Sequence, residues 1–325
     1  MTGFFKQKNA SNNLLLLVYA LVLKFNLFLR PVGPLKQTDD HFLYKWLIGF
    51  LEPLQLSPVI YIFISFVLLY TQATLFNRIC NEQKILGKPN YLPAMAYILI
   101  TSLFPDWNVF SSPLLVNSFL IWIFYKLITL PNAGKPGSSI FNIGFFMGVI
   151  SLLYQPALVF VLLTWIAIAM MRPFRIQEFL INILGVTTPY YFIAIVLYLS
   201  NAWDWNKLKP VFTFGLPAMP SSVFITISIG LLVLPFIIGG FFVQANLNKM
   251  FIQVRKSWSL LLLFVITSTL IVLVDGGNGY VNWLLCAVPL TAFHAAAYYF
   301  PNNKNFPLIM HWILFGYAIY INYWL

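Results

Sequence analysis

Long runs of apolar residues, separated by short polar stretches, recur along the whole chain of 325 residues. A run of about 17–25 apolar residues can cross a bilayer as a helix, because the lipid core offers the backbone no water to bond. The runs do not alternate over about ten residues, as the strands of membrane barrels do. The pattern therefore predicts an all-α, polytopic transmembrane helical bundle. Its helices should cover residues 13–29, 56–77, 92–105, 111–130, 140–154, 157–171, 180–200, 221–243, 258–274, 280–299 and 306–324.

The third and fifth of these eleven segments are short for a crossing, so we expect nine to eleven spans in one integral membrane domain, residues 1–325. Proline and glycine are frequent in or beside the spans. Small residues let membrane helices approach closely, and helix breaks are tolerated where a cavity lies inside the protein. Broken helices and close packing are expected around Pro93, Pro105, Pro156, Pro189, Pro235, Gly144, Gly148, Gly185, Gly239 and Gly240.

The composition supports a membrane protein and excludes two other classes. Hydrophobic residues make up 60% of the chain, and the charged residues are 19 Lys or Arg and 8 Asp or Glu. A soluble domain of this length would carry roughly 80 charges at the usual share of about 25%. The chain therefore cannot cover a soluble surface with polar groups. Disorder is excluded as well, because it needs low hydrophobicity and high charge.

The distribution of Lys and Arg predicts the orientation, since these residues accumulate in cytoplasmic loops. A cytoplasmic N-terminus places 13 of them inside, and only Arg30, Lys36, Lys45, Lys207 and Lys209 outside. We therefore predict eleven crossings with the C-terminus outside, in a bacterial inner membrane. The net charge of +11 is then a topology signal and not a nucleic-acid footprint. The same topology places all five aspartates outside, either because aspartates prefer water or because a polar site opens there.

The first extracytoplasmic loop, residues 30–55, carries the densest candidate chemistry. Asp39, Asp40 and His41 are consecutive in it, between flanking cations. Carboxylates are ligands for Mg²⁺ or Mn²⁺, and one of them could act as a general base on an attacking hydroxyl. Alternatively, Thr38, Asp39 or Asp40 could cap an interfacial helix from His41 to Leu51, whose Phe42, Trp46 and Phe50 would lie on the membrane surface.

The second sizeable extracytoplasmic loop, residues 201–220, places Trp203 and Trp205 on either side of Asp204, with Lys207 and Lys209 following. Indole rings suit sugar faces, and lysines suit a phosphate. The alternative interpretation is an interfacial aromatic belt with snorkelling lysines. A third outer turn, 275–280, is rich in glycine, which permits a tight reversal.

Two other cationic positions have competing interpretations. Lys24 lies inside the first span, where an ionisable group is a functional candidate, but it is also close enough to the outer end to snorkel. Arg172 and Arg175 lie on the predicted inner face, where they could hold a lipid phosphate or simply anchor the protein at the headgroups.

Four strings within residues 90–201 carry a resemblance. They are NYLPAMAYILITSLFPDW, SSPLLVNSFLIWIF, SIFNIGFFMGVISLLYQPALVF and MRPFRIQEFLINILGVTTPYYF. They resemble an uncharacterised polytopic inner-membrane family of Bacteroidota. More distantly, the stretch is similar to the GT-C superfamily of polyprenyl-phosphate-sugar glycosyltransferases, in the order of its short and long spans and its outer turns.

The GT-C resemblance implies a site at the extracytoplasmic face. Asp39 or Asp40 would be the first-loop acid, which activates an acceptor or binds metal, although Asp-Asp-His matches the usual context only approximately. The cations for a leaving phosphate would be Arg30, Lys36, Lys207 and Lys209, while Trp203 and Trp205 would stack on sugar. The partners implied are membrane lipids and a polyprenyl-phosphate sugar. The competing hypothesis is a non-catalytic scaffold or accessory subunit with envelope protein partners, or a carrier of a lipid-linked precursor.

Overall fold

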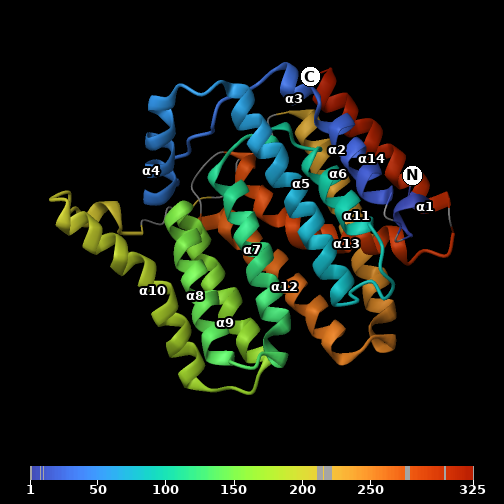
Figure 1. Ribbon diagram of the computed structural model, residues 1–325. Helices are drawn as coiled ribbons and strands as arrows, with labels where there is room; N and C mark the ends of the chain where they lie inside the picture. Colours follow the sequence, from blue (N-terminus) through green and yellow to red (C-terminus); the bar gives the residue numbers. More distant parts are fainter. Residues whose placement is uncertain are drawn as a thin grey trace.

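The computed structural model describes residues 2–7, 9, 11–210, 215, 222–274, 279–303 and 305–324. It confirms the all-α fold: these residues form helices and no β-strand, apart from an isolated bridge between Asp40 and Tyr154 (Figure 1). The α-helices are α1 (Thr2–Phe5), α2 (Ser11–Lys24), α3 (Asn26–Leu29), α4 (Phe42–Leu51), α5 (Pro58–Glu82), α6 (Leu92–Thr101), α7 (Ser112–Thr129), α8 (Pro136–Leu153), α9 (Phe160–Met171), α10 (Ile176–Leu199), α11 (Val223–Asn246), α12 (Ile252–Val274), α13 (Ala287–Tyr299) and α14 (Asn305–Tyr323). The 3₁₀ helices are η1 (Glu52–Leu54), η2 (Pro105–Asn108), η3 (Leu130–Asn132), η4 (Gln155–Val159), η5 (Trp205–Lys207), η6 (Leu247–Lys249) and η7 (Tyr280–Cys286).

Seven helical segments among the described residues are long and apolar enough to cross a membrane. They are Pro58–Glu82, Ser112–Asn132, Pro136–Leu153, Ile176–Leu199, Val223–Lys249, Ile252–Leu273 and Tyr280–Tyr299. Three shorter apolar segments are Ser11–Lys24, Leu92–Thr101 and Gln155–Met171. Together with α14, these segments overlap all eleven predicted ranges. The chain is therefore a multi-pass helical membrane protein, while eleven crossings and a cytoplasmic N-terminus stay predictions.

Three segments differ in detail from the sequence prediction. The fifth is not short, because Pro136 starts α8 and the helix runs 18 residues to Leu153. Proline suits the first turn of a helix, where its missing N–H costs nothing. The third is short, as predicted, with ten residues in α6, and the sixth is also short, since η4 replaces the expected first turn of α9. The first is broken between α2 and α3, at Phe25.

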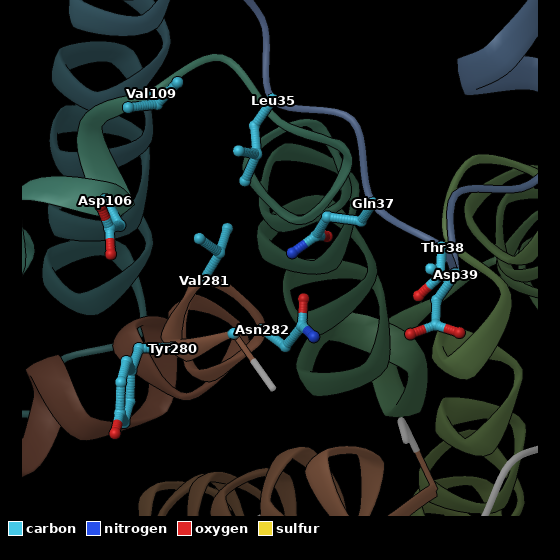
Figure 2. Close-up of a pocket in the computed structure, with 10 residues that line it drawn as sticks. Leu35, Gln37, Thr38, Asp39, Asp106, Val109, Tyr280, Val281 and Asn282 are labelled. Atoms are coloured by element: carbon cyan, nitrogen blue, oxygen red, sulfur yellow. The ribbon is translucent and has the colours of Figure 1, made fainter. Parts of the chain in front are cut away.

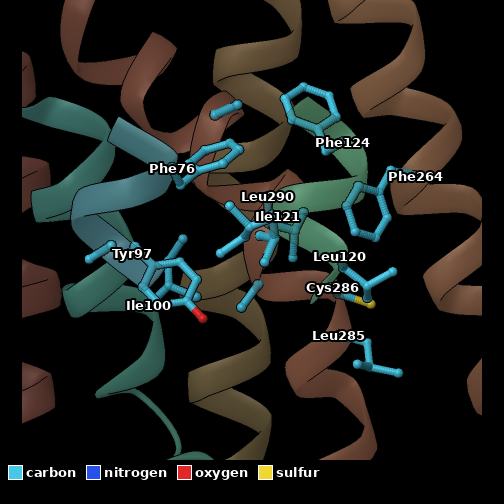
Figure 3. Packing of buried hydrophobic residues seen from close by; sticks show 14 of the residues in the cluster. Phe76, Tyr97, Ile100, Leu120, Ile121, Phe124, Phe264, Leu285, Cys286 and Leu290 are labelled. Atoms are coloured by element: carbon cyan, nitrogen blue, oxygen red, sulfur yellow. The ribbon is translucent and has the colours of Figure 1, made fainter. Parts of the chain in front are cut away.

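The centre of the bundle consists of α6 and α13, which pack against each other. Every residue of α6 is buried, and so is every residue of α13 except Tyr299. A helix that is apolar on all sides belongs inside a bundle, surrounded by other helices. Figure 3 shows this core, where Tyr97 and Ile100 of α6 lie near Leu290 of α13. By contrast, α10 and α11 expose most of their apolar side chains, as expected for helices that face lipid.

Glycines allow two pairs of helices to touch along their backbones, as the sequence predicts. A Cβ on Gly144 or Gly148 of α8 would lie 2.2 Å from the Asn182 carbonyl oxygen or 2.3 Å from that of Val186 on α10. A Cβ on Gly185 of α10 would lie 2.4 Å from a carbonyl oxygen of α8. Gly239 plays the same part between α11 and α13. Only a residue without a Cβ permits these contacts. Gly240 has no such neighbour, so close packing there is not observed.

Lys24 does not snorkel to the surface. Its side chain is buried, and its Nζ donates hydrogen bonds to Thr101 Oγ1, at 3.0 Å, and to Asn108 Oδ1. Thr101 is the last residue of α6, where backbone carbonyls lack partners within the helix. Lys24 therefore ties the first helix to the end of the central one, a position that its sequence context did not reveal.

Candidate functional site

The two loops with candidate chemistry meet at one end of the bundle, which is the end predicted to be extracytoplasmic. Leu152 of α8, Leu197 of α10 and Leu208 of the second loop form a small buried cluster, against which Phe42 packs. This apolar contact joins α4 to the second loop and to the two long helices α8 and α10. The first loop and the described part of the second loop therefore both pack against the helices of the bundle.

Backbone hydrogen bonds fix the first-loop segment, which we define as residues 35–41. The Leu35 amide donates to the Phe110 carbonyl at 2.8 Å, and the His41 amide donates to the Leu153 carbonyl at 3.2 Å. In return, the Asp39 carbonyl accepts a hydrogen bond from the Gln155 amide at 3.2 Å. The segment is thus anchored to the start of α7 at one end and to the α8–η4 turn at the other.

The helix predicted in the first loop is present as α4, but the proposed cap on it is wrong, and its position at the membrane surface stays a prediction. His41 is the N-cap residue, and no side chain caps the helix. The Asp40 carboxylate instead accepts hydrogen bonds from the Gln37 amide, at 2.6 Å, and from the hydroxyl of Ser112, at the start of α7. Trp46 and Phe50 are exposed and stacked, with ring centroids 6.1 Å apart, which suits a helix on a membrane surface. The prediction is wrong for Phe42, which packs inward against the Leu152, Leu197 and Leu208 cluster.

His41 links the two loops directly. Its imidazole donates a hydrogen bond to the Lys209 backbone, while its Nδ1 is buried and has no hydrogen-bond partner. Burial, and then the nearby Lys45, lower the pKa of His41 to about 4. The imidazole is therefore neutral at physiological pH, so the local positive charge comes from lysines.

A cleft of about 660 Å³ lies where the loops meet. It is lined by Thr38, Asp40, His41, Phe42, Lys45, Trp46, Gln155, Asp204, Asn206, Lys207 and Lys209. Its three lysines are exposed, and none of them belongs to an ion pair of the described residues. The Asp204 carboxylate accepts a hydrogen bond from the Asn206 amide, at 2.9 Å, and the Lys207 ammonium donates to the Ala202 carbonyl, at 3.0 Å. We call this space the cationic cleft.

The structure brings some of the predicted site residues together and leaves others apart. Asp40, His41, Asp204, Lys207 and Lys209 all line the cationic cleft, as does Lys45, which the sequence interpretation did not include in the site. Lys36 forms an exposed ion pair with Glu52 and lines a neighbouring pocket of about 260 Å³ together with Asp40.

The aromatic and arginine candidates lie outside the cleft lining. Trp203 and Trp205 are 48% and 60% exposed, with ring centroids 6.4 Å apart. Arg30 is exposed at the end of α3 and lines none of the cavities described. Stacking of a sugar on the two Trp rings and a phosphate contact at Arg30 stay predictions. Asp275, together with most of the predicted 275–280 turn, lies outside the described residues.

Asp39 faces a different cavity from Asp40. Figure 2 shows a pocket of about 400 Å³ lined by Leu35, Gln37, Thr38, Asp39, Asp106, Val109, Gly279, Tyr280, Val281 and Asn282. The Trp107 indole donates a hydrogen bond to the Tyr280 carbonyl, at 2.8 Å, which holds η2 against η7. The Asp106 side chain is exposed, yet surrounding protein atoms still raise its pKa through desolvation. We call this space the acidic pocket.

Two members of the acidic pocket are not evident from sequence. Asp106 follows the turn Phe104-Pro105, which indicates a loop but no particular chemistry. Asn282 is a single amide within an apolar run, where nothing in the local pattern distinguishes a site residue from a buried structural one. A polar residue placed in a predicted span next to a loop is the only available signal.

The arrangement of donor side chains does not fit the predicted Mg²⁺ or Mn²⁺ ion. The described residues contain no group of three or more His, Cys, Asp or Glu side chains that could hold a metal ion. Asp39 and Asp40 line different cavities, and the Asp40 oxygens already accept hydrogen bonds from Gln37 and Ser112. The two carboxylates therefore do not fit a shared metal site.

A scan of protein families identifies this chain's family. The model of a family of unknown function, DUF6427, matches residues 41–322, and the chain belongs to that family. No curated protein and no solved structure matches the chain. The resemblance to GT-C glycosyltransferases and the bacterial group stay predictions from the sequence.

Proposed function

We propose that this membrane protein binds a phosphate-bearing lipid at the extracytoplasmic ends of its helices and transfers the attached sugar, in the manner of a GT-C-like glycosyltransferase. The observation that supports it is the cationic cleft. Lys45, Lys207 and Lys209 converge there without ion-pair partners among the described residues. A cluster of ammonium groups beside lipid-facing helices suits a phosphate whose hydrocarbon chain stays in the membrane.

The proposed reaction needs a base, an electrophilic carbon and a stabilised leaving group. An acceptor hydroxyl attacks the anomeric carbon of the sugar, the bond from that carbon to the phosphate oxygen breaks, and the lipid phosphate leaves with its electron pair. Lys207 and Lys209 would stabilise the charge on the departing phosphate. The candidate base is Asp39, which lines the acidic pocket next to the cleft, while Asp40 accepts two hydrogen bonds that hold the loop.

A carrier or accessory function is the second candidate, and the state of Asp40 favours it. A carboxylate that accepts hydrogen bonds from Gln37 and Ser112 serves the architecture of the loop. A protein of this kind would hold the lipid phosphate in the cleft and present it to an envelope partner without transferring the sugar. The two candidates share the lipid site and differ only in whether the phosphate–sugar bond breaks.

The decisive experiment separates binding from transfer. The full chain in nanodiscs is titrated with a polyprenyl phosphate, and then incubated with the same lipid carrying a labelled hexose and a hydroxyl acceptor. The double variant Lys207→Ala, Lys209→Ala should bind the lipid about tenfold more weakly or worse, and raising the salt concentration should weaken wild-type binding. Lys249→Ala, an exposed lysine distant from these loops in the sequence, is the matched control.

The outcomes distinguish the proposals. The transferase is supported if the double variant loses lipid binding, and if the wild type releases lipid phosphate from the hexose lipid while Asp39→Asn does not. Binding without release of lipid phosphate supports the carrier. Equal binding by wild type and the double variant contradicts both candidates.

A further inference from the structure

The acidic pocket is a formed cavity that the cationic cleft does not include. Three separate parts of the chain build it: the first-loop segment, η2 and η7 (Figure 2). Its volume of about 400 Å³ falls within the range of about 300–1,000 Å³ typical of small-molecule sites. Thr38 lines both this pocket and the cationic cleft, so the two cavities adjoin across the first-loop segment.

Buried amide groups in the pocket lack hydrogen-bond partners. Asn282 is only 2% exposed, and its Oδ1 has no partner; Gln37 Oε1 is likewise buried and unpaired. Buried polar atoms in proteins are nearly always hydrogen-bonded, so exceptions need an explanation. A ligand hydroxyl that enters the pocket would supply the missing donors.

The lining of the pocket selects against anions and against metal ions. It contains two carboxylates, Asp39 and Asp106, and no Lys or Arg among the described lining residues. A phosphate would be repelled there. A metal ion would need more carboxylate, imidazole or thiolate ligands than the described residues gather at any one place. Carboxylates and amides together suit vicinal hydroxyl groups, and hydrogen bonds from a hydroxyl to an ionised carboxylate are strong.

We infer that the acidic pocket binds the neutral sugar ring of the substrate, while the phosphate lies in the adjoining cationic cleft. The inference rests on the proposed function and adds a second half to its site. Asp106 and Asn282 bind the ring hydroxyls beside the candidate base Asp39, and the apolar Leu35 and Val281 contact the less polar part of the ring. The site thus recognises charge on one side of the first-loop segment and neutral hydroxyls on the other.

The test measures the sugar and the phosphate separately on the full chain in nanodiscs. The probes are a bare polyprenyl phosphate, the same lipid with one hexose, and a soluble methyl hexoside followed by saturation-transfer NMR. Asn282→Ala and Asp106→Asn should each weaken sugar-dependent binding by about three- to tenfold, the value of one or two hydrogen bonds. Neither variant should change the affinity for the bare lipid. Asn117→Ala, which removes a buried amide that donates to Leu284, is the control for folding.

Each outcome either supports or overturns the inference. The pocket is assigned to the donor sugar if the wild type binds the hexose lipid more tightly than the bare lipid and the variants reduce this difference in affinity. If the variants weaken methyl hexoside binding but the hexose lipid binds no better than the bare lipid, the pocket belongs to the acceptor and the inference is overturned. The inference is overturned if both variants keep wild-type sugar binding, or if a cationic amine of similar size binds where the neutral hexoside does not. Asp106 is exposed, so Asp106→Asn remains informative even if Asn282→Ala does not fold. Failure of bare-lipid binding, by contrast, would count against the proposed function alone.

Discussion

The cationic cleft and the acidic pocket lie on two sides of the same short stretch of chain, yet they differ in charge. The cleft collects Lys45, Lys207 and Lys209, whereas the pocket collects Asp39 and Asp106 and no described cation. The first-loop segment passes between them, and Thr38 contributes to both. The difference shows that position along the chain is a poor guide to which charges act together.

Asp39 and Asp40 illustrate this most clearly. As neighbours in sequence they suggest a carboxylate pair that could share a metal ion or a proton. The chain turns at this point, where the Asp40 amide donates to the Gln37 carbonyl at 3.4 Å, and the two side chains line different cavities. Asp40 accepts the hydrogen bonds that hold the loop, and Asp39 lines the acidic pocket.

The largest expected effect comes from breaking the anchor between the two cavities. Asp40→Ala leaves the Ser112 hydroxyl and the Gln37 amide without their acceptor, in a place where Asp40 is only 3% exposed. We expect a loss of stability of about 2–4 kcal/mol and weaker ligand binding in both cavities. Thermal unfolding in detergent, followed by circular dichroism, measures the first effect.

Asp106→Ala is the control for that prediction, because it removes an exposed carboxylate that lines the acidic pocket. Its thermal midpoint should stay close to that of the wild type, while sugar binding should weaken. If Asp106→Ala proves as destabilising as Asp40→Ala, the structural role assigned to Asp40 is wrong.

A smaller effect should appear as the pH falls, through His41, which joins the loops on the cleft side. Its pKa is about 4 in the folded protein and about 6.5 when unfolded, so the unfolded chain binds the proton more tightly. The contribution of the neutral His41 to the free energy of unfolding is therefore complete above pH 6.5, and it is lost as the pH falls from 6.5 to 4. The pKa difference corresponds to at most about 3 kcal/mol.

The measurement is the thermal midpoint from pH 8 to pH 4 for wild type and His41→Gln. The wild type should lose more stability than the variant over the acid range, because glutamine carries no titratable group. Parallel curves would show that His41 is not held neutral between the two loops.

The smallest effect should come from Lys36, which the sequence interpretation placed among the phosphate ligands. Its ion pair with Glu52 is exposed, and exposed ion pairs contribute about 0–1 kcal/mol. Lys36→Ala should therefore leave both the thermal midpoint and the affinity for lipid phosphate nearly unchanged. If Lys36→Ala weakened lipid binding as much as Lys207→Ala, the phosphate site would lie closer to α4 than we propose.

The helices were predictable from the sequence, and the contacts between loops were not. Apolar runs identify each membrane helix because burial in lipid imposes the same requirement on every span. The glycines at close helix crossings were also predictable, because only small residues let two membrane helices approach so closely. The meeting of His41 with Lys209 depends on how Leu152, Leu197 and Leu208 pack, which no local pattern encodes. The buried contacts of Lys24 and the unpaired amide of Asn282 likewise appear only when distant helices are assembled.

The most direct test of the two-sided site is a structure of the full chain in nanodiscs with a bound polyprenyl-phosphate hexose. The account predicts the phosphate within hydrogen-bonding distance of Lys207 or Lys209, and hexose hydroxyls beside Asn282 and Asp106. A phosphate bound instead at Arg172 and Arg175, or a sugar ring that leaves the acidic pocket empty, would contradict it.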